Sequence, residues 1–225
     1  MSSNVRAIIL YGSHSRKDND AKSDVDVCVF VDRLEQKVDM SFLGNLTGES
    51  FAKDTNFVSY STATLSLMIA NGSLFLWHLK NESKILYGKS YFDKTIKNLR
   101  PFKGHASEIK FHHELLDDLI ASWKYVCIPN EFDLALLFTI ARNTCMVLCH
   151  KKGLFCFGRM SSFNNAKNLF PDMPLEVDCY SYLSGWKMIY ERGDLEEKKI
   201  PNMIRYKNLV ACLKGLLEYA KKKTD

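Results

Sequence analysis

Residues 24–31 read DVDVCVFV, and this alternation constrains the fold more than any other feature of the chain. Successive side chains of a β-strand point to opposite faces, so the four valines share one face and predict a buried strand. Asp24 and Asp26 then lie side by side at the open end of the other face. Two carboxylates in that position are suited to binding one or two hard divalent cations through oxygen.

An apolar segment at residues 5–11 predicts a second strand, and the pair Gly12-Ser13 is expected to turn the chain after it. The connection from residue 14 to residue 23 is polar and contains both acidic and basic side chains. We therefore expect it to be an exposed loop between the two strands. Further strands are predicted at residues 56–61 and 84–87, with helical patterns over residues 34–53 and, broken near Gly72, over residues 62–82.

The sequence becomes strongly helical after Arg100-Pro101. Apolar residues at helical spacing predict further helices, each with a face that must pack, at residues 107–126, 131–152, 161–169, 178–192 and 201–222. We therefore expect an α+β protein. It would have a small mixed β-sheet unit at residues 1–100, followed by a C-terminal helical bundle at residues 101–225.

Composition limits the class of protein. With 225 residues, of which 46% are hydrophobic, the chain can bury a sizeable core. No secretory leader or membrane-spanning stretch is expected. The net charge of +5 is spread over both halves, so RNA is permitted as a partner but not indicated. The seven cysteines form no CxxC pair, which favours reduced thiols and a cytoplasmic location.

One motif resembles a known signature. Gly12-Ser13, ten further residues, and Asp24-Val25-Asp26 at the head of an apolar strand are similar to the pattern of the nucleotidyltransferase superfamily. That superfamily includes DNA polymerase beta, kanamycin nucleotidyltransferase and the minimal nucleotidyltransferases of prokaryotes. The helical half is similar, by pattern alone, to the second domain of the antibiotic nucleotidyltransferases.

The resemblance implies a role for each motif residue. Asp24 and Asp26 would hold magnesium, as one or two ions, against the triphosphate of an NTP such as ATP. Gly12 would let the backbone approach a phosphate closely, and Ser13 would donate to the phosphate oxygens. Arg16 and Lys17 could reach the triphosphate, although ordinary solvation explains these two side chains equally well.

The family usually has a third carboxylate on the next core strand. In residues 56–61, NFVSYS, we expect the matching position to be Ser59, which cannot supply the charge of a carboxylate. Either the enzyme is weakened or the third acid comes from Asp54, Glu131 or Asp133. The last two are also explained as solvated acids at a helix start, where they suit the helix dipole.

The implied activity is transfer of a nucleoside monophosphate from an NTP to a hydroxyl acceptor, with release of pyrophosphate. The acceptor stays open between an aminoglycoside-like small molecule, a protein and RNA. Because of Ser59, the alternative is a nucleotide-binding regulatory or antitoxin-like partner protein with little or no turnover. A homodimer or a toxin–antitoxin type of partner is compatible with either interpretation.

Rival sites are suggested by the helical half. Arg142 and His150 on one predicted helix resemble the Arg and His pair of HEPN ribonuclease domains, although their separation is longer. Cys145, Cys149 and His150 could be drawn as part of a zinc site, but their apolar surroundings favour buried thiols.

Two aromatic and histidine clusters complete the candidates. Residues 73–80, SLFLWHLK, resemble a platform for stacking a base. Their spacing favours a buried helix face instead, with Trp77 in the core and His78 undecided. His112-His113, followed by acidic residues, is more typical of a solvated helix face than of a cleft.

Overall fold

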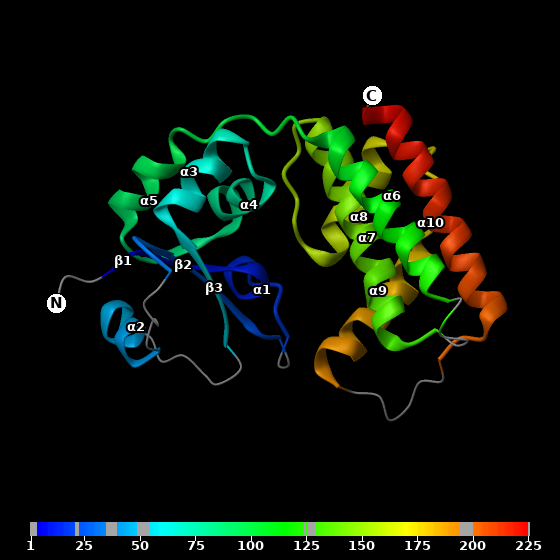
Figure 1. The fold of residues 1–225 in the computed structure, drawn as a ribbon, viewed down its shortest axis with the longest axis horizontal. Coiled ribbons are helices and arrows are strands. Elements are labelled where there is room, and N and C mark those ends of the chain that lie inside the picture. The colour runs from blue at the N-terminus through cyan, green and yellow to red at the C-terminus, as the bar shows by residue number, and fades with distance from the viewer. Residues whose placement is uncertain are drawn as a thin grey trace. The chain divides into compact units, whose positions relative to one another are not determined.

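The computed structural model describes residues 4–20, 23–34, 40–48, 55–123, 125, 129–193 and 200–224. The chain divides into two compact units, Met1–Lys103 and Gly104–Asp225. The first contains a mixed sheet with helices on both faces, and the second is helical in its described residues (Figure 1). The predicted α+β class, a mixed-sheet core followed by a helical region, is confirmed.

The first unit is built on a four-stranded sheet in the order β3-β2-β1-β4. Strand β1 runs antiparallel to β2 and to β4, whereas β2 and β3 are parallel. The elements of this unit are β1 (Val5–Tyr11), α1 (Gly12–Arg16), β2 (Val25–Val31), α2 (Met40–Thr47), β3 (Thr55–Ser61), α3 (Thr62–Ala70), α4 (Leu74–Glu82), β4 (Lys84–Tyr87) and α5 (Lys89–Ile96).

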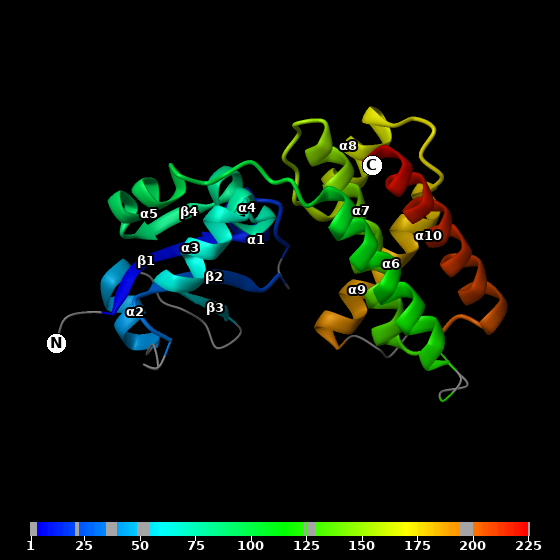
Figure 2. The same cartoon turned by 45° about the horizontal axis from the view of Figure 1, so that its top comes forward.

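Both faces of the sheet are covered, as Figures 1 and 2 show. On one face Cys28 and Phe30 pack against apolar side chains of α3, α4 and α5. On the other face Val27 and Val29 are fully buried and pack with Leu43 of α2. The valine alternation therefore predicted its buried face correctly, and the strand is central enough to be buried on both sides at its C-terminal end.

The connection between β1 and β2 differs from the expected exposed loop. Its first five residues form helix α1, and Ser13 and Arg16 are half-buried there. A polar composition predicted exposure correctly only from Lys17 to Asp20. The short helix forms because Gly12 can take a positive φ of 73° directly after the strand, which reverses the chain into a helical turn.

The second unit is a bundle centred on its longest apolar helix. Helix α7 packs against each of the other four described helices of this unit, and most of its apolar side chains are buried. The elements of this unit are α6 (His105–Ser122), α7 (Glu131–Lys151), α8 (Arg159–Leu169), α9 (Val177–Arg192) and α10 (Met203–Thr224).

Helix α7 corrects one expectation from the sequence. It is long and apolar enough to cross a membrane by length and composition, although no such stretch was expected. Two thirds of its most apolar window, 67%, is buried inside the helical unit. That burial is typical of the core helix of a soluble domain, where apolar residues on all sides meet neighbouring helices.

Candidate active site at the N-terminal ends of β2 and α1

Gly12 is packed against the carboxylate of Asp26. Tyr11, the last residue of β1, pairs with Asp26 in the antiparallel ladder, so the chain turns directly beside this side chain. A Cβ atom built on Gly12 would overlap Oδ2 of Asp26. Two constraints therefore select glycine at position 12: its positive φ and the adjacent carboxylate.

Asp24 and Asp26 lie at the open end of β2, where burial gives way to solvent. Asp24 is exposed and Asp26 is half-buried, while the residues of β2 from Val27 to Val31 are all buried. Asn56 is the register partner of Asp26 on β3, and its amide Nδ2 donates a hydrogen bond to Oδ2 of Asp24. An amide from the neighbouring strand thus contacts the carboxylate of Asp24, from the position that pairs with Asp26.

The prediction that Ser59 occupies the position of the third carboxylate was wrong. Ser59 pairs with Val29, so it belongs to the valine face of the sheet rather than to the face of Asp26. The β3 residues that pair with the face of Asp26 are Asn56, Val58 and Tyr60. None of these three residues is an acid. The interpretation that β3 provides no carboxylate therefore remains, but it now depends on these residues instead of Ser59.

Arg16 enters a charged cluster that the sequence did not indicate. Its Nε donates to Asp18 at 3.1 Å, and its Nη1 donates to Oε2 of Glu82 on α4 at 3.3 Å. Nε2 of His78 lies 3.4 Å from the same Glu82 oxygen. The side chains of Arg16 and Glu82 are only 19% and 17% exposed, so this is a largely desolvated pair.

Sequence reasoning overlooked Glu82 because it lies sixty-six residues from Arg16 in the chain. The available signal was weak: His78 and Glu82 are four residues apart, which places them on one face of a helix. His78 was undecided from the sequence and is buried in the structure, with its ring edge-on to Tyr11 at 5.8 Å. Burial and the carboxylate of Asp26 raise the pKa of Tyr11.

Lys17 ends helix α1 in the left-handed conformation, with φ 63° and ψ 29°. Within the described part of the chain, it is the single non-glycine residue with a positive φ. Its backbone N–H donates to the carbonyl of Ser13, and the N–H of Asp18 donates to the same oxygen at 3.2 Å. The exposed side chain of Lys17 is therefore fixed at its base by the turn that closes the helix.

The three other suggested sources of a third carboxylate lie in different environments. Asp54 lies outside the described residues. Asp133 is buried in a capping box at the start of α7, where its carboxylate accepts from the N–H of Asn130 and the Asn130 side chain accepts from its own N–H. That arrangement assigns Asp133 a structural role in helix initiation. Glu131, two residues earlier, is half-exposed in the first turn of α7.

The two carboxylates suit a hard cation whose remaining coordination positions are filled by substrate and water. Magnesium is commonly held by one or two carboxylates, with the remaining positions taken by water and phosphate oxygens. Asp26 in β2 and Asp24 directly before that strand supply that number of carboxylates. Among the residues that the structure describes, no group of three His, Cys, Asp or Glu side chains could hold a metal ion.

Comparison with known families assigns the N-terminal unit. Residues 1–91 match the family model described as polymerase beta, nucleotidyltransferase. The N-terminal unit is a polymerase beta-type nucleotidyltransferase domain. The matched residues include β1, α1 and β2, and they end inside α5. A search of curated proteins found no match to the chain.

In the helical unit, the residues of the suggested metal and nuclease sites are buried or half-buried. Cys145 and Cys149 are fully buried, as favoured from their apolar surroundings. His150 Nδ1 lies 2.9 Å from Nε2 of His105 on α6, and the two rings share one hydrogen bond. Arg142 instead interacts electrostatically with Tyr180 of α9.

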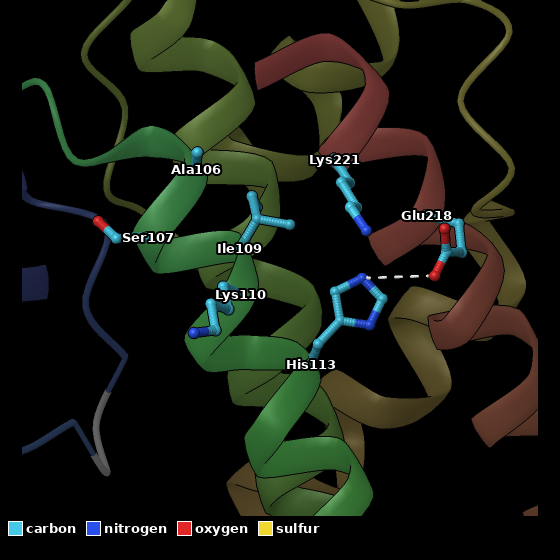
Figure 3. Close-up of a pocket in the computed structure, with 7 residues that line it drawn as sticks. All are labelled: Ala106, Ser107, Ile109, Lys110, His113, Glu218 and Lys221. Carbon is cyan, nitrogen blue, oxygen red and sulfur yellow. Dashed lines mark ion pairs between the residues drawn. The ribbon is translucent and has the colours of Figure 1, made fainter. Parts of the chain in front are cut away.

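The His112-His113 pair divides between core and surface. His112 is buried and hydrogen-bonds through Nδ1 to the hydroxyl of Thr144 at 3.2 Å, so it is not on a solvated face. His113 faces a hollow of about 540 Å³ between α6 and α10, where Figure 3 shows it pointing toward Glu218. Its Nε2 lies 3.8 Å from Oε1 of Glu218, and Lys221 lines the same hollow.

Trp77 belongs to the packing of the nucleotidyltransferase domain. It packs against the apolar cluster between the sheet and its helices, and its indole N–H donates to the carbonyl of Arg100 at 3.2 Å. Lys80 lies over the ring, 4.5 Å from its centroid. These contacts occupy both the edge and a face of the ring, so the buried-face interpretation is favoured over a base-stacking platform.

Proposed function

We propose that this protein transfers a nucleoside monophosphate from an NTP to a hydroxyl acceptor and releases pyrophosphate. The observation that carries the proposal is the packing of Gly12 against Asp26, with Asp24 beside it, inside a nucleotidyltransferase domain. The turn and the two carboxylates form one unit, because the backbone at Gly12 and the Asp26 side chain are in contact.

In the reaction, the acceptor oxygen bonds to the α-phosphorus of the NTP, and the bond from that phosphorus to the bridging oxygen of pyrophosphate breaks. The acceptor hydroxyl releases its proton to water in the same exchange. Asp24 and Asp26 would hold magnesium, which when bound offsets the charge of the triphosphate and of the departing pyrophosphate. Ser13 and the backbone N–H groups of the α1 turn would donate to phosphate oxygens.

Arg16 and Lys17 would act on the triphosphate from the end of α1. In the structure, Arg16 is held by Asp18 and Glu82, so binding an NTP would exchange or share these carboxylates with phosphate oxygens. Lys17 lies at the left-handed turn with an exposed side chain and would add a flexible positive charge. We propose a cytoplasmic site of action, in keeping with free cysteines throughout the described residues.

A second function is favoured by one observation: the β3 positions on the face of Asp26 are Asn56, Val58 and Tyr60. Without a carboxylate there, the domain would bind an NTP with magnesium and turn it over slowly or not at all. The protein would then act as a nucleotide-dependent partner of another macromolecule, in the manner of a regulatory or antitoxin-like protein.

The test is transfer of label from each α-phosphate-labelled NTP, with magnesium, into separated small-molecule, RNA and protein fractions. The variants are Asp24→Asn and Asp26→Asn, with Asp93→Asn as a control, because Asp93 is an exposed acid of the same unit paired with Lys89. We expect label in one fraction with the wild type and with Asp93→Asn, and no label with Asp24→Asn or Asp26→Asn. Transfer that persists in both Asp24→Asn and Asp26→Asn would refute the proposal, and NTP binding without transfer would establish the second function.

A further inference from the structure

The hollow between α6 and α10 has the size of a small-molecule site. Its volume is about 540 Å³, and pockets that hold small ligands commonly measure about 300–1,000 Å³. The residues that line it come from the N-terminal half of α6 and from the last two turns of α10. These residues all belong to the helical unit, whereas the proposed transfer site belongs to the first unit. The hollow is therefore a separate feature of the chain.

A lysine supplies positive charge at one end of the hollow. Figure 3 shows the side chain of Lys221 extending from α10 toward the space beside α6. Within the described part of the chain, no ion pair holds its ammonium group. Lys110 lines the same hollow, but its Nζ is already paired with Oε1 of Glu114 on its own helix, at 3.6 Å. Lys221 is therefore the lining cation that is available to an anionic group.

A histidine and a glutamate supply two further polar groups that do not satisfy each other. Nε2 of His113 lies 3.8 Å from Oε1 of Glu218, which is beyond hydrogen-bonding distance. That nitrogen is shielded from water and has no hydrogen-bond partner among the described residues. Because the Glu218 side chain is 60% exposed, its carboxylate can turn and admit another group to Nε2. Leaving a buried nitrogen without a partner is costly, so a group that fills this gap is favoured.

The chemistry of these two side chains selects the group that would lie between them. The neighbouring carboxylate favours the tautomer of His113 that carries its proton on Nε2, so this nitrogen is a donor. Glu218 is an acceptor only. A hydroxyl group can accept from the one and donate to the other, whereas an ammonium group can only donate. This end of the hollow therefore suits a hydroxyl group.

Two apolar side chains of α6 complete the lining. Ala106 and Ile109 both line the hollow, and Figure 3 shows Ile109 pointing toward the space between the two helices. Apolar surface of this kind is covered favourably by a hydrocarbon body. The lining thus combines an ammonium group, an apolar wall and a site for a hydroxyl group.

We propose that this hollow binds a small hydroxycarboxylate. Its carboxylate would pair with Lys221, and its hydrocarbon body would cover Ala106 and Ile109. Its hydroxyl group would accept from Nε2 of His113 and donate to Glu218. A carboxylate carries one negative charge, which one available ammonium group balances. The site is additional to the proposed transfer reaction and does not depend on it.

The test titrates the full-length protein with 4-(hydroxymethyl)benzoate, without NTP or magnesium, and follows the Ile109 methyl groups and the His113 ring by NMR. We expect saturable shifts of both residues. Benzoate lacks the hydroxyl group and 4-methylbenzyl alcohol lacks the carboxylate, so each should bind about tenfold more weakly. 4-(Aminomethyl)benzoate should also bind more weakly, because its ammonium group cannot accept from His113.

Two lysine variants separate a specific contact from a general effect of charge. Lys221→Met should weaken binding of 4-(hydroxymethyl)benzoate about tenfold. Lys222→Met is the matched control, since it removes the same charge from the next residue, which is exposed and outside the lining of the hollow. We expect its affinity to equal that of the wild type.

Several outcomes would overturn the proposal. Equal weakening in Lys221→Met and Lys222→Met would exclude a specific carboxylate contact. Tighter binding of 4-(aminomethyl)benzoate than of 4-(hydroxymethyl)benzoate would exclude the hydroxyl assignment. The absence of saturable shifts in the wild type up to about 10 mM 4-(hydroxymethyl)benzoate would exclude the site itself. These readouts need no variant to fold for the last test, and none of them depends on nucleotidyl transfer.

Discussion

Gly12 lies against Asp26 with no room for a side chain between them, which couples the backbone of the α1 turn to the carboxylate on β2. The positive φ of 73° at Gly12 places the turn there. A change at either residue therefore alters both the turn and the carboxylate of the proposed site.

Gly12→Ala should abolish transfer and destabilise the first unit. The alanine would have to adopt the left-handed region, at about 1–2 kcal/mol, and its Cβ would displace the Asp26 carboxylate. Gly48→Ala is a matched control, since Gly48 has a φ of 71° and open space around it. Urea unfolding and label transfer measure the two effects, and equal losses of activity in the two variants would contradict the coupling.

Asn56→Asp should strengthen magnesium binding, because it adds a carboxylate on the face shared with Asp24 and Asp26. We expect affinity to rise about tenfold, or about 1.4 kcal/mol, in titration calorimetry with a non-hydrolysable NTP. Ser59→Asp should give no such gain and should instead destabilise the unit, because it points to the valine face. Tighter magnesium binding by Ser59→Asp would show that our assignment of the two faces is wrong.

Glu82→Gln should reduce the stability of the first unit by about 1–3 kcal/mol, because Arg16 and His78 would lose the carboxylate they share in a largely desolvated place. Asp32→Asn removes the partner of Arg6 in a solvent-exposed ion pair and should have a much smaller effect. Unfolding in urea compares them directly. Equal effects would show that the buried cluster adds no more than a surface pair.

His112→Gln should reduce the acid sensitivity of the helical unit. Burial, with a smaller effect of His113, lowers the pKa of His112 to about 4 in the folded state, against about 6.5 when unfolded. The unfolded chain binds this proton more tightly than the folded chain does. The contribution of His112 to the free energy of unfolding is therefore fully present above pH 6.5 and is lost as the pH falls toward 4.

The contribution of His112 over that range is on the order of 3 kcal/mol. Unfolding free energies measured at intervals from pH 7 to pH 4 should therefore fall less steeply in His112→Gln than in the wild type. NMR titration of the His112 ring gives an independent check, and a ring that titrates near pH 6.5 in the folded protein would contradict this origin of the acid sensitivity.

The sequence alone determined what depends on local periodicity. The alternation in residues 24–31 identified the buried strand that contains Asp26 and directly follows Asp24, and helical spacing identified the mainly helical second half. Such patterns survive because a strand or helix buries one face whatever its partner. The exposed loop expected from residue 14 was partly wrong, because Gly12 allows a helical turn that composition does not reveal.

Tertiary structure alone decided which distant residues meet. The register of β3 against β2 places Asn56 beside Asp26 and turns Ser59 to the opposite face, and a shift of one residue would exchange them. The contact of Arg16 with Glu82 likewise arises from packing of separate elements. Periodicity fixes the faces of each element, but only packing of the whole chain fixes which faces come together.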